Sequence, residues 1–165
     1  MPKLEMLEMR VAAVTHDPGS NRPVLILKND DAGKILPIWI GPYEAYAIMA
    51  AIEGVEPTRP LTHDLIKGLL AAMDAEVERV VINDLADNTF YALIVLDTHT
   101  GRLEVDARPS DAIAVALRVG APIYVSRTVL DTSGATAEGE IEEPDRFRKM
   151  LADLKPEDFD FDKPS

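Results

Sequence analysis

The sequence predicts an α+β fold: a single compact domain in which a sheet, mostly antiparallel or mixed, packs against about three helices. Its 165 residues suffice for one core and are too few for two full-sized domains. Apolar residues make up 47% and charged residues 28% of the chain, which is typical of globular proteins. Segments of alternating apolar and β-branched residues lie between helical patterns, which predicts strands and helices packed as layers.

The first half of the chain predicts three strands and one helix. The strands are expected at residues 4–15, 23–29 and 34–40, with NDDAGK as a hairpin that has Gly33 at its turn. The segment GPYEAYAIMAAIEG predicts a helix that starts at Pro42, a favoured first helical position, and stops at Gly54. The proline-rich connection VEPTRP follows.

The second half predicts two more helices and four strands. Thr62 is expected to be the N-cap of a helix, THDLIKGLLAAM, with an apolar stripe formed by Leu65, Ile66, Leu69 and Leu70. Strands are expected at 76–85, 89–97 and 102–107, followed by the helix PSDAIAVALRVG and a short strand at 123–125.

This order of elements suggests an internal duplication of a βββα unit. The segments LPIWIGPYEAYAI (36–48) and LEVDARPSDAIAV (103–115) share Leu, Pro, an acid and two alanines at a spacing of 67. The alternative is that similar turn chemistry arose twice by chance. In the alignment Glu44 corresponds to Asp111, which favours a helix-start role for both acids.

The last part of the chain differs in composition. Residues 131–165 contain 11 acids and 5 bases, and we expect them to form an acidic extension of the domain at 1–130. A short docking helix is possible at 145–154, and the final residues are expected to be mobile. The net charge is −12, so the chain lacks the basic footprint of a general nucleic-acid binder.

Composition also limits the chemistry. No apolar run is long enough to span a membrane, and the N-terminus lacks the apolar core of a signal peptide, so we expect a cytoplasmic protein. The absence of cysteine fits that reducing compartment and excludes thiolate chemistry. No phosphate-binding loop, dinucleotide fingerprint, serine-hydrolase elbow or zinc-protease motif occurs.

A polar cluster joins the strand at 102–107 to the following helix. In a functional interpretation, Arg108, Ser110 and the first amides of the helix bind a phosphate, with Asp106 and Asp111 as metal ligands or base. In a structural interpretation, Asp106 pairs with Arg108 while Ser110 and Asp111 cap the helix. The residues alone leave both open.

A second candidate group follows the proline-rich connection. His63 can act as a base or acid, Asp64 can bind a metal, and Arg59 can contact a phosphate. Both His63 and Asp64 also suit a solvated first helical turn. Trp39, the single tryptophan, could stack on a base or simply pack at a strand end.

Four motifs together resemble the bifunctional nuclease domain family: LPIWIG, GVEPTRPLTHDLI, FYALIVL and VDARPSDAIAVALRVGAPIYV, within about residues 6–130. The resemblance implies a compact mixed α/β domain that commonly self-associates, most simply as a dimer, and nuclease activity on DNA and RNA. The family's polar motif positions fall on His63 and Asp64 in LTHDL, and on Asp106, Arg108, Ser110 and Asp111 in VDARPSDA. Many members have Ser or Ala at the place of Asp106.

These observations favour a phosphodiesterase assisted by Mg²⁺ or Mn²⁺. Asp64, Asp106 or Asp111 would hold the metal, His63 would act as base, and Arg108 would stabilise the developing charge. The acidic chain favours short or single-stranded nucleic acid as substrate. The alternatives are a non-catalytic module that binds an anion or a protein partner, and a structural oligomer formed through a sheet edge at VLILK or FYALIVL. Whether His63 and Asp64 approach Asp106 and Arg108 is the observation that would distinguish the phosphodiesterase from these alternatives.

Overall fold

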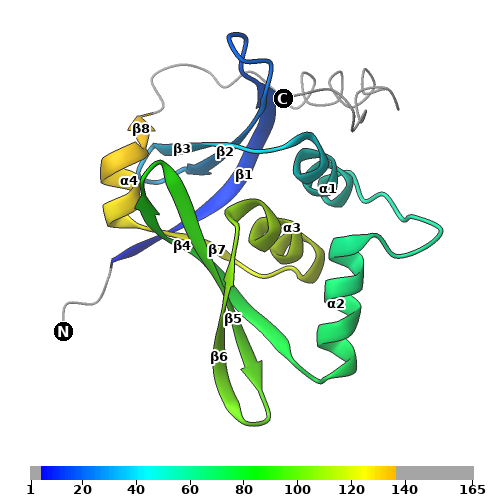
Figure 1. Ribbon diagram of the computed structural model, residues 1–165. Coiled ribbons are helices and arrows are strands. Elements are labelled where there is room, and N and C mark those ends of the chain that lie inside the picture. Colours follow the sequence, from blue (N-terminus) through cyan, green and yellow to red (C-terminus); the bar gives the residue numbers. More distant parts are fainter. Residues whose placement is uncertain (1–4, 137–165) are drawn as a thin grey trace.

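The structure is a computed structural model that describes residues 5–136, and it confirms a single α+β domain (Figure 1). The strands are β1 Met6–His16, β2 Pro23–Asn29, β3 Lys34–Trp39, β4 Glu76–Ala86, β5 Thr89–Thr98, β6 Gly101–Ala107, β7 Ile123–Ser126 and β8 Ala135–Thr136. The helices are α1 Pro42–Ile52, α2 Thr62–Ala72, α3 Pro109–Val119 and α4 Arg127–Ser133. The expected docking helix at 145–154 lies outside the described residues.

All eight described strands form one mixed sheet in the order β6-β5-β4-β7-β1-β2-β3-β8. Only β4 and β7 are parallel, and every other neighbouring pair is antiparallel. The sheet edges are therefore β6 and β8. The prediction that VLILK or FYALIVL offers an exposed edge is wrong, because these segments are β2 and β5 and each has a strand on both sides.

The arrangement of strands supports the predicted duplication. Each half forms an antiparallel three-stranded meander followed by a Pro-led helix: β1-β2-β3-α1 and β4-β5-β6-α3. Val14, Leu25 and Ile38 lie side by side across the first meander. The corresponding row in the second is Val80, Ile94 and Val105. A bulge interrupts the pairing of the first strand at the matching place in both units, after Val11 and after Val77.

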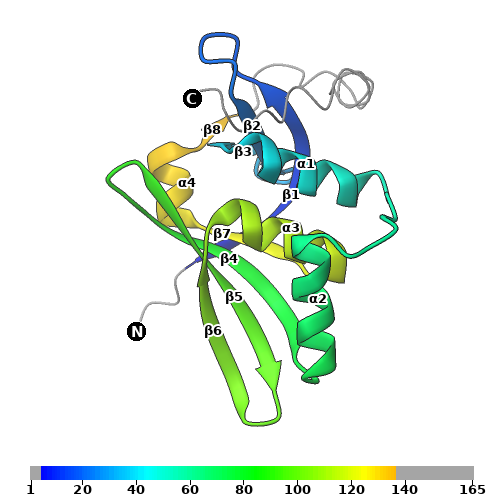
Figure 2. The ribbon, with the colours of Figure 1, turned by 45° about the vertical axis from the view of Figure 1, so that its right-hand side comes forward.

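Helices α1, α2 and α3 lie together, with α3 between α1 and α2, while α4 lies apart from them and packs on β3, β4 and β7 (Figure 2). Alanines dominate the buried face of α3, since the small residues at positions 112, 114 and 116 are fully buried. Small side chains let helix backbones approach closely, so α3 packs against the sheet, α1 and α2 at once. This packing brings the first turns of α1, α2 and α3 to one region.

Two details of the predicted helices need correction. Leu61, not Thr62, is the N-cap of α2, and Thr62 is the first helical residue. Only half of the predicted apolar stripe on α2 packs on the core, because Ile66 and Leu70 contact it while Leu65 and Leu69 are exposed. The cause is that α2 rests mainly on α3 rather than on the sheet.

Helix α4 and strand β8 were not predicted. Helix α4 has seven residues, of which only Val129 and Leu130 are buried. Two adjacent buried residues do not reveal the spacing of apolar residues that predicts a helix. The expected boundary between residues 130 and 131 falls inside α4, and β8 pairs with β3. The sheet therefore includes the chain as far as Thr136.

Candidate functional site

Three helices carry an acidic side chain at their third residue: Glu44 in α1, Asp64 in α2 and Asp111 in α3. An acid at this position faces the exposed amides and the positive end of the helix dipole, so the sequence favours a helix start at each place. In α1 and α3 a proline occupies the first helical position, as predicted.

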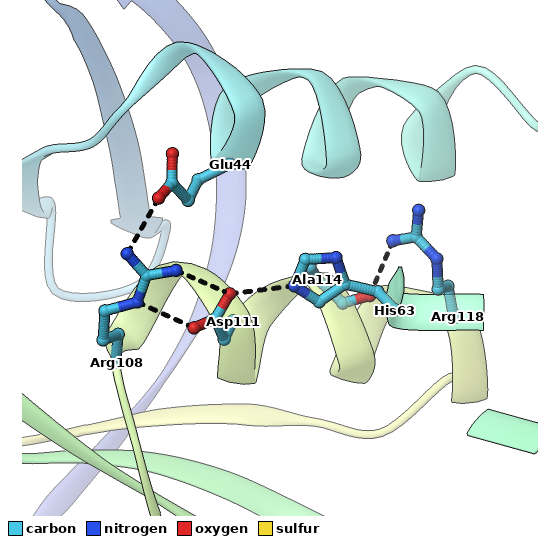
Figure 3. A network of polar contacts seen from close by, with 6 residues as sticks. All are labelled: Glu44, His63, Arg108, Asp111, Ala114 and Arg118. Carbon is cyan, nitrogen blue, oxygen red and sulfur yellow. Dashed lines mark hydrogen bonds and ion pairs between the residues drawn. The ribbon is translucent and has the colours of Figure 1, made fainter. Parts of the chain in front are cut away.

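Arg108 joins two of these acids (Figure 3). It is the N-cap residue of α3, and its Nε and Nη2 donate to the two carboxylate oxygens of Asp111 at 2.8 and 3.2 Å. Its Nη1 donates to Glu44 Oε1 of α1 at 2.8 Å. A guanidinium has five N–H donors, and these contacts use three of them. Two donors therefore remain, on a side chain that is mostly exposed.

His63 completes the cluster from α2. Its Nε2 lies 2.9 Å from Asp111 Oδ1, and its side chain is only 12% exposed. An ionised carboxylate accepts but does not donate, so Nε2 carries the hydrogen in this contact. In the neutral imidazole, Nδ1 is then the nitrogen that can take up a proton. We name Glu44, His63, Arg108 and Asp111 the helix-start cluster.

The environment of Asp111 keeps it ionised. Burial is the largest single influence and acts to raise its pKa, but the hydrogen bonds from Arg108 and His63 outweigh burial. The pKa of Asp111 is therefore lowered from its ordinary value. The same contact raises the pKa of Arg108. The centre of the cluster is a charged pair at neutral pH.

Asp64 belongs to a separate contact. Its Oδ1 accepts from Arg118 Nε at 2.8 Å, and its Oδ2 accepts from the backbone N–H of Leu61 at 3.0 Å. Burial raises the pKa of Asp64, yet the hydrogen bonds from Arg118 and Leu61 outweigh it and lower that pKa. Arg118 is 7% exposed and also donates to the carbonyl of Ala114. This pair fastens the start of α2 to the end of α3.

The other predicted site residues lie outside the cluster. Asp106 is exposed on β6 opposite Leu93. The interpretation in which Asp106 pairs with Arg108 is wrong, because Arg108 pairs with Glu44 and Asp111. Ser110 is buried in the first turn of α3. Trp39 donates to Asp17 at 3.1 Å from the end of β3, and Arg59 is exposed in the connection before α2.

The three acids expected to hold a metal, Asp64, Asp106 and Asp111, do not converge. Asp64 faces Arg118, Asp111 faces Arg108 and His63, and Asp106 lies on the sheet edge. Between residues 5 and 136, no three His, Asp or Glu side chains are grouped so that they could hold a metal ion. In this arrangement the predicted ligands do not fit Mg²⁺ or Mn²⁺, which prefer several oxygen donors around one centre.

Two residues of these contacts were not predicted as site residues. Glu44 was recognisable from the duplication, because it occupies the position of Asp111 in the first unit. Arg118 was recognisable as the one charged residue after Asp111 in a helix otherwise made of apolar side chains. Neither signal indicates which partner the side chain meets.

Comparison with known proteins gives this cluster a context. A family model described as the bifunctional nuclease domain matches residues 25–138, more than half of the chain. The chain belongs to the bifunctional nuclease domain family. All four residues of the helix-start cluster lie within the matched segment.

Similar proteins occur in bacteria and plants. "Uncharacterized protein Rv1829" of Mycobacterium tuberculosis is 43% identical over 164 residues, covering 93% of this chain and 98% of that protein. "Bifunctional nuclease 2" of rice is 32% identical, and "Bifunctional nuclease 1" of Arabidopsis thaliana is 30% identical. Each plant match covers 68% of this chain but only 36% of the plant protein. No helix among residues 5–136 has the length and apolarity needed to cross a membrane.

Proposed function

We propose that this protein is a nuclease that hydrolyses phosphodiester bonds in DNA and RNA, with short or single-stranded molecules as its preferred substrates. The observation that carries the proposal is the convergence of His63 from α2 with Arg108 and Asp111 from α3. His63 lies 45 or more positions before the other two residues in the chain, and the three combine a base, an anion-binding group and an acid that orients the base. The family name and the plant relatives point to the same activity.

In the proposed reaction, the two unused donors of Arg108 bind a non-bridging phosphate oxygen. The contacts to Glu44 and Asp111 hold the guanidinium plane in place while it does so. Phosphate binding therefore requires no loss of the existing ion pairs. The positive charge then stabilises the additional negative charge that develops as water attacks phosphorus.

His63 is the proposed general base. Asp111 holds Nε2–H, which leaves Nδ1 to accept a proton from the attacking water as a new P–O bond forms. The bond to the leaving oxygen breaks, and that oxygen takes a proton from solvent. In this scheme Asp64 positions α2 through Arg118, so that His63 reaches Asp111.

We also propose that Mg²⁺ or Mn²⁺ assists the reaction. The carboxylates of Asp64 and Asp111, which were expected to bind the metal, are each paired with an arginine instead. Phosphate contacts by Ser110, Arg59 and Trp39 are also proposals. The cytoplasm as the site of action, and a homo-oligomer as the active form, complete the proposed function. The lack of cysteine supports the cytoplasmic location, and the open sheet edge at β6 supports the homo-oligomer.

The test is an assay of the purified chain on single-stranded DNA and RNA, with Mg²⁺, with Mn²⁺ and with EDTA. His63→Gln is expected to lower the rate by about 10²–10⁴-fold, as removal of a general base does. Arg108→Lys keeps the charge but loses the fork geometry, and we expect it to be impaired as well. His99→Gln, at an exposed histidine in the turn between β5 and β6, is the matched control and should leave the rate unchanged. Equal activity in all variants would identify a contaminating nuclease and reject the proposal.

A non-catalytic module that binds an anion is the second candidate. It is favoured by the fact that the charges of the helix-start cluster are already mutually paired, as in a structural ion-pair network. This candidate predicts no hydrolysis, but a rise in melting temperature with inorganic phosphate that disappears in Arg108→Ala.

A further inference from the structure

The third strands of the two repeats, β3 and β6, correspond in sequence but differ in surroundings. On its outer side β3 pairs with β8, Ile35 opposite Ala135 and Lys34 opposite Thr136, and α4 packs against it. Among residues 5–136, β6 pairs only with β5, and no described helix packs extensively against it. Within the described residues, the third strand of the second unit therefore lacks the outer strand and the packed helix that the third strand of the first unit has.

The difference is visible in two pairs of equivalent side chains. Leu36 and Ile38 of β3 are 0% and 3% exposed, whereas Leu103 and Val105, 67 positions later, are 49% and 44% exposed. Leu103 and Val105 lie opposite Leu96 and Ile94, which belong to the core. They therefore extend the core face of the sheet to its open edge.

An open edge seven residues long, with apolar side chains on one face, is a template for another strand. The opposite face of β6 carries Arg102, Glu104 and Asp106, so its charge changes sign along the strand. Such a strand can be complementary to itself when it runs antiparallel to a second copy.

We propose that two copies of this chain associate by antiparallel pairing of β6 with β6. The twofold axis is perpendicular to the sheet and passes midway between Leu103 of one copy and Leu103 of the other, which we call the axis at Leu103. The inference rests on the proposed self-association and gives it an interface. It is independent of hydrolysis, because β6 contributes no residue to the helix-start cluster.

The charges of β6 determine which residues of the two β6 strands lie opposite one another. An axis through Glu104 would place Glu104 opposite itself, and an axis through Val105 would place Glu104 opposite Asp106 of the second copy. An axis through Leu103 places Arg102 opposite Glu104 of the second copy, twice, and Leu103 opposite Leu103. Like charges directly opposite are destabilising and unlike charges stabilising, so the axis lies at Leu103.

Arg102 already has a partner within the sheet. Its Nε and Nη2 donate to the Glu78 carboxylate of β4 at 2.8 and 2.9 Å, so the contact draws the guanidinium across β5, away from the open edge. Its Nη1 hydrogens are the donors left over for Glu104 of the second copy. In the dimer Leu103 and Val105 would lose much of their exposure.

The first experiment measures mass by size exclusion with light scattering on the full chain. The wild type is expected to be a dimer. Leu103→Lys puts two ammonium groups on the axis and is expected to give a monomer, while Glu104→Arg raises the dissociation constant by about tenfold or more. Leu65→Lys is the matched control, because Leu65 of α2 is 53% exposed, close to the 49% of Leu103. Circular dichroism of each variant checks that it folds.

The second experiment uses the absence of cysteine in the chain. Opposite residues of antiparallel strands have Cα atoms about 4.5–5.5 Å apart, within the range that a disulfide spans. Leu103→Cys is therefore expected to form a covalent dimer under mild oxidation, and Leu65→Cys is not. A monomeric wild type would reject both self-association and the interface. An oligomeric wild type in which Leu103→Cys fails to cross-link would reject the interface alone.

Discussion

Glu44 and Asp111 occupy the same position in the two repeats, 67 residues apart, and both accept hydrogen bonds from Arg108. The residue equivalent to Arg108 in the first repeat is Gly41, which has no side chain. One arginine thus serves the helix starts of both units. The contact ties α1 to α3, and it forms the anion-binding part of the proposed active site.

Removal of Arg108 is expected to destabilise the protein modestly. In Arg108→Ala, Glu44 and Asp111 lose their shared cation and repel each other, which should lower the free energy of unfolding by about 1–2 kcal/mol. Arg10→Ala is a suitable control, because Arg10 has similar exposure and, within the described part of the chain, pairs with one carboxylate, that of Asp30. Urea unfolding at pH 7 should show the larger loss in Arg108→Ala, and equal losses would contradict a bridging role.

Two Gly→Ala substitutions are expected to differ. A β-carbon on Gly41 would collide with the Glu44 carboxylate, so Gly41→Ala displaces that side chain from Arg108. Gly68 lies in α2 with nothing within 4 Å of an added β-carbon, and Gly68→Ala should raise stability by about 0.5–1 kcal/mol.

Chemical unfolding of both variants checks this difference. A double-mutant cycle of Gly41→Ala with Arg108→Ala should be non-additive, because both changes break the same contact. Additive effects would show that Gly41 acts independently of the Glu44 contact.

The buried Arg118 is expected to contribute more to stability than the exposed arginines. Arg118→Ala leaves Asp64 without its charged partner and opens a cavity beside α3, so we expect a loss of about 2–4 kcal/mol. In Arg118→Met combined with Asp64→Asn, the volume is largely kept and the unpaired charge removed, and part of the stability should return. Thermal unfolding of the single and double variants gives the comparison. A single variant within 0.5 kcal/mol of wild type would contradict the importance of this pair.

The helix-start cluster is expected to make stability depend on pH in the acid range. The pKa of Asp111 is lower in the folded protein than in the unfolded chain, because Arg108 and His63 outweigh the effect of burial. Its contribution is therefore fully present above the unfolded pKa of about 3.9 and is lost as the pH falls through the folded pKa.

Urea unfolding from pH 7 to pH 3 tests this dependence. The stability difference between wild type and Asp111→Asn should shrink as the pH falls below about 4. In an Arg108→Ala background the same difference should depend less on pH. A difference that stays constant over the whole range would show that Asp111 is not stabilised in its ionised form.

The order of strands and helices up to β7 was predictable because each of these elements carries its own local pattern. Pro42 and Pro109 start their helices as expected, and the duplication relates Glu44 to Asp111. The repeat also aligns Leu103 with Leu36, yet Leu36 is fully buried and Leu103 is exposed. Burial depends on whether another element covers the strand, and α4 packs against β3 but not extensively against β6.

Side-chain partners were less predictable, because they depend on how helices pack. His63 and Asp64 are neighbours in sequence, yet one meets Asp111 and the other meets Arg118. Adjacent residues on a helix point about 100° apart, so a single turn can face two different partners. The sequence left open whether His63 and Asp64 join the same site, and the packing of α2 on α3 gives them different partners.

The position of β7 determines when the sheet can form. This short strand lies between β4 and β1, and among residues 5–136 no other strand-to-strand pairing joins the two repeats. During synthesis, each meander can form its own hairpins early, but the halves become a continuous sheet only after Ser126 has emerged. Folding to the complete domain is therefore expected to wait for a four-residue segment near the end of the described chain, which pairs with strands made long before it.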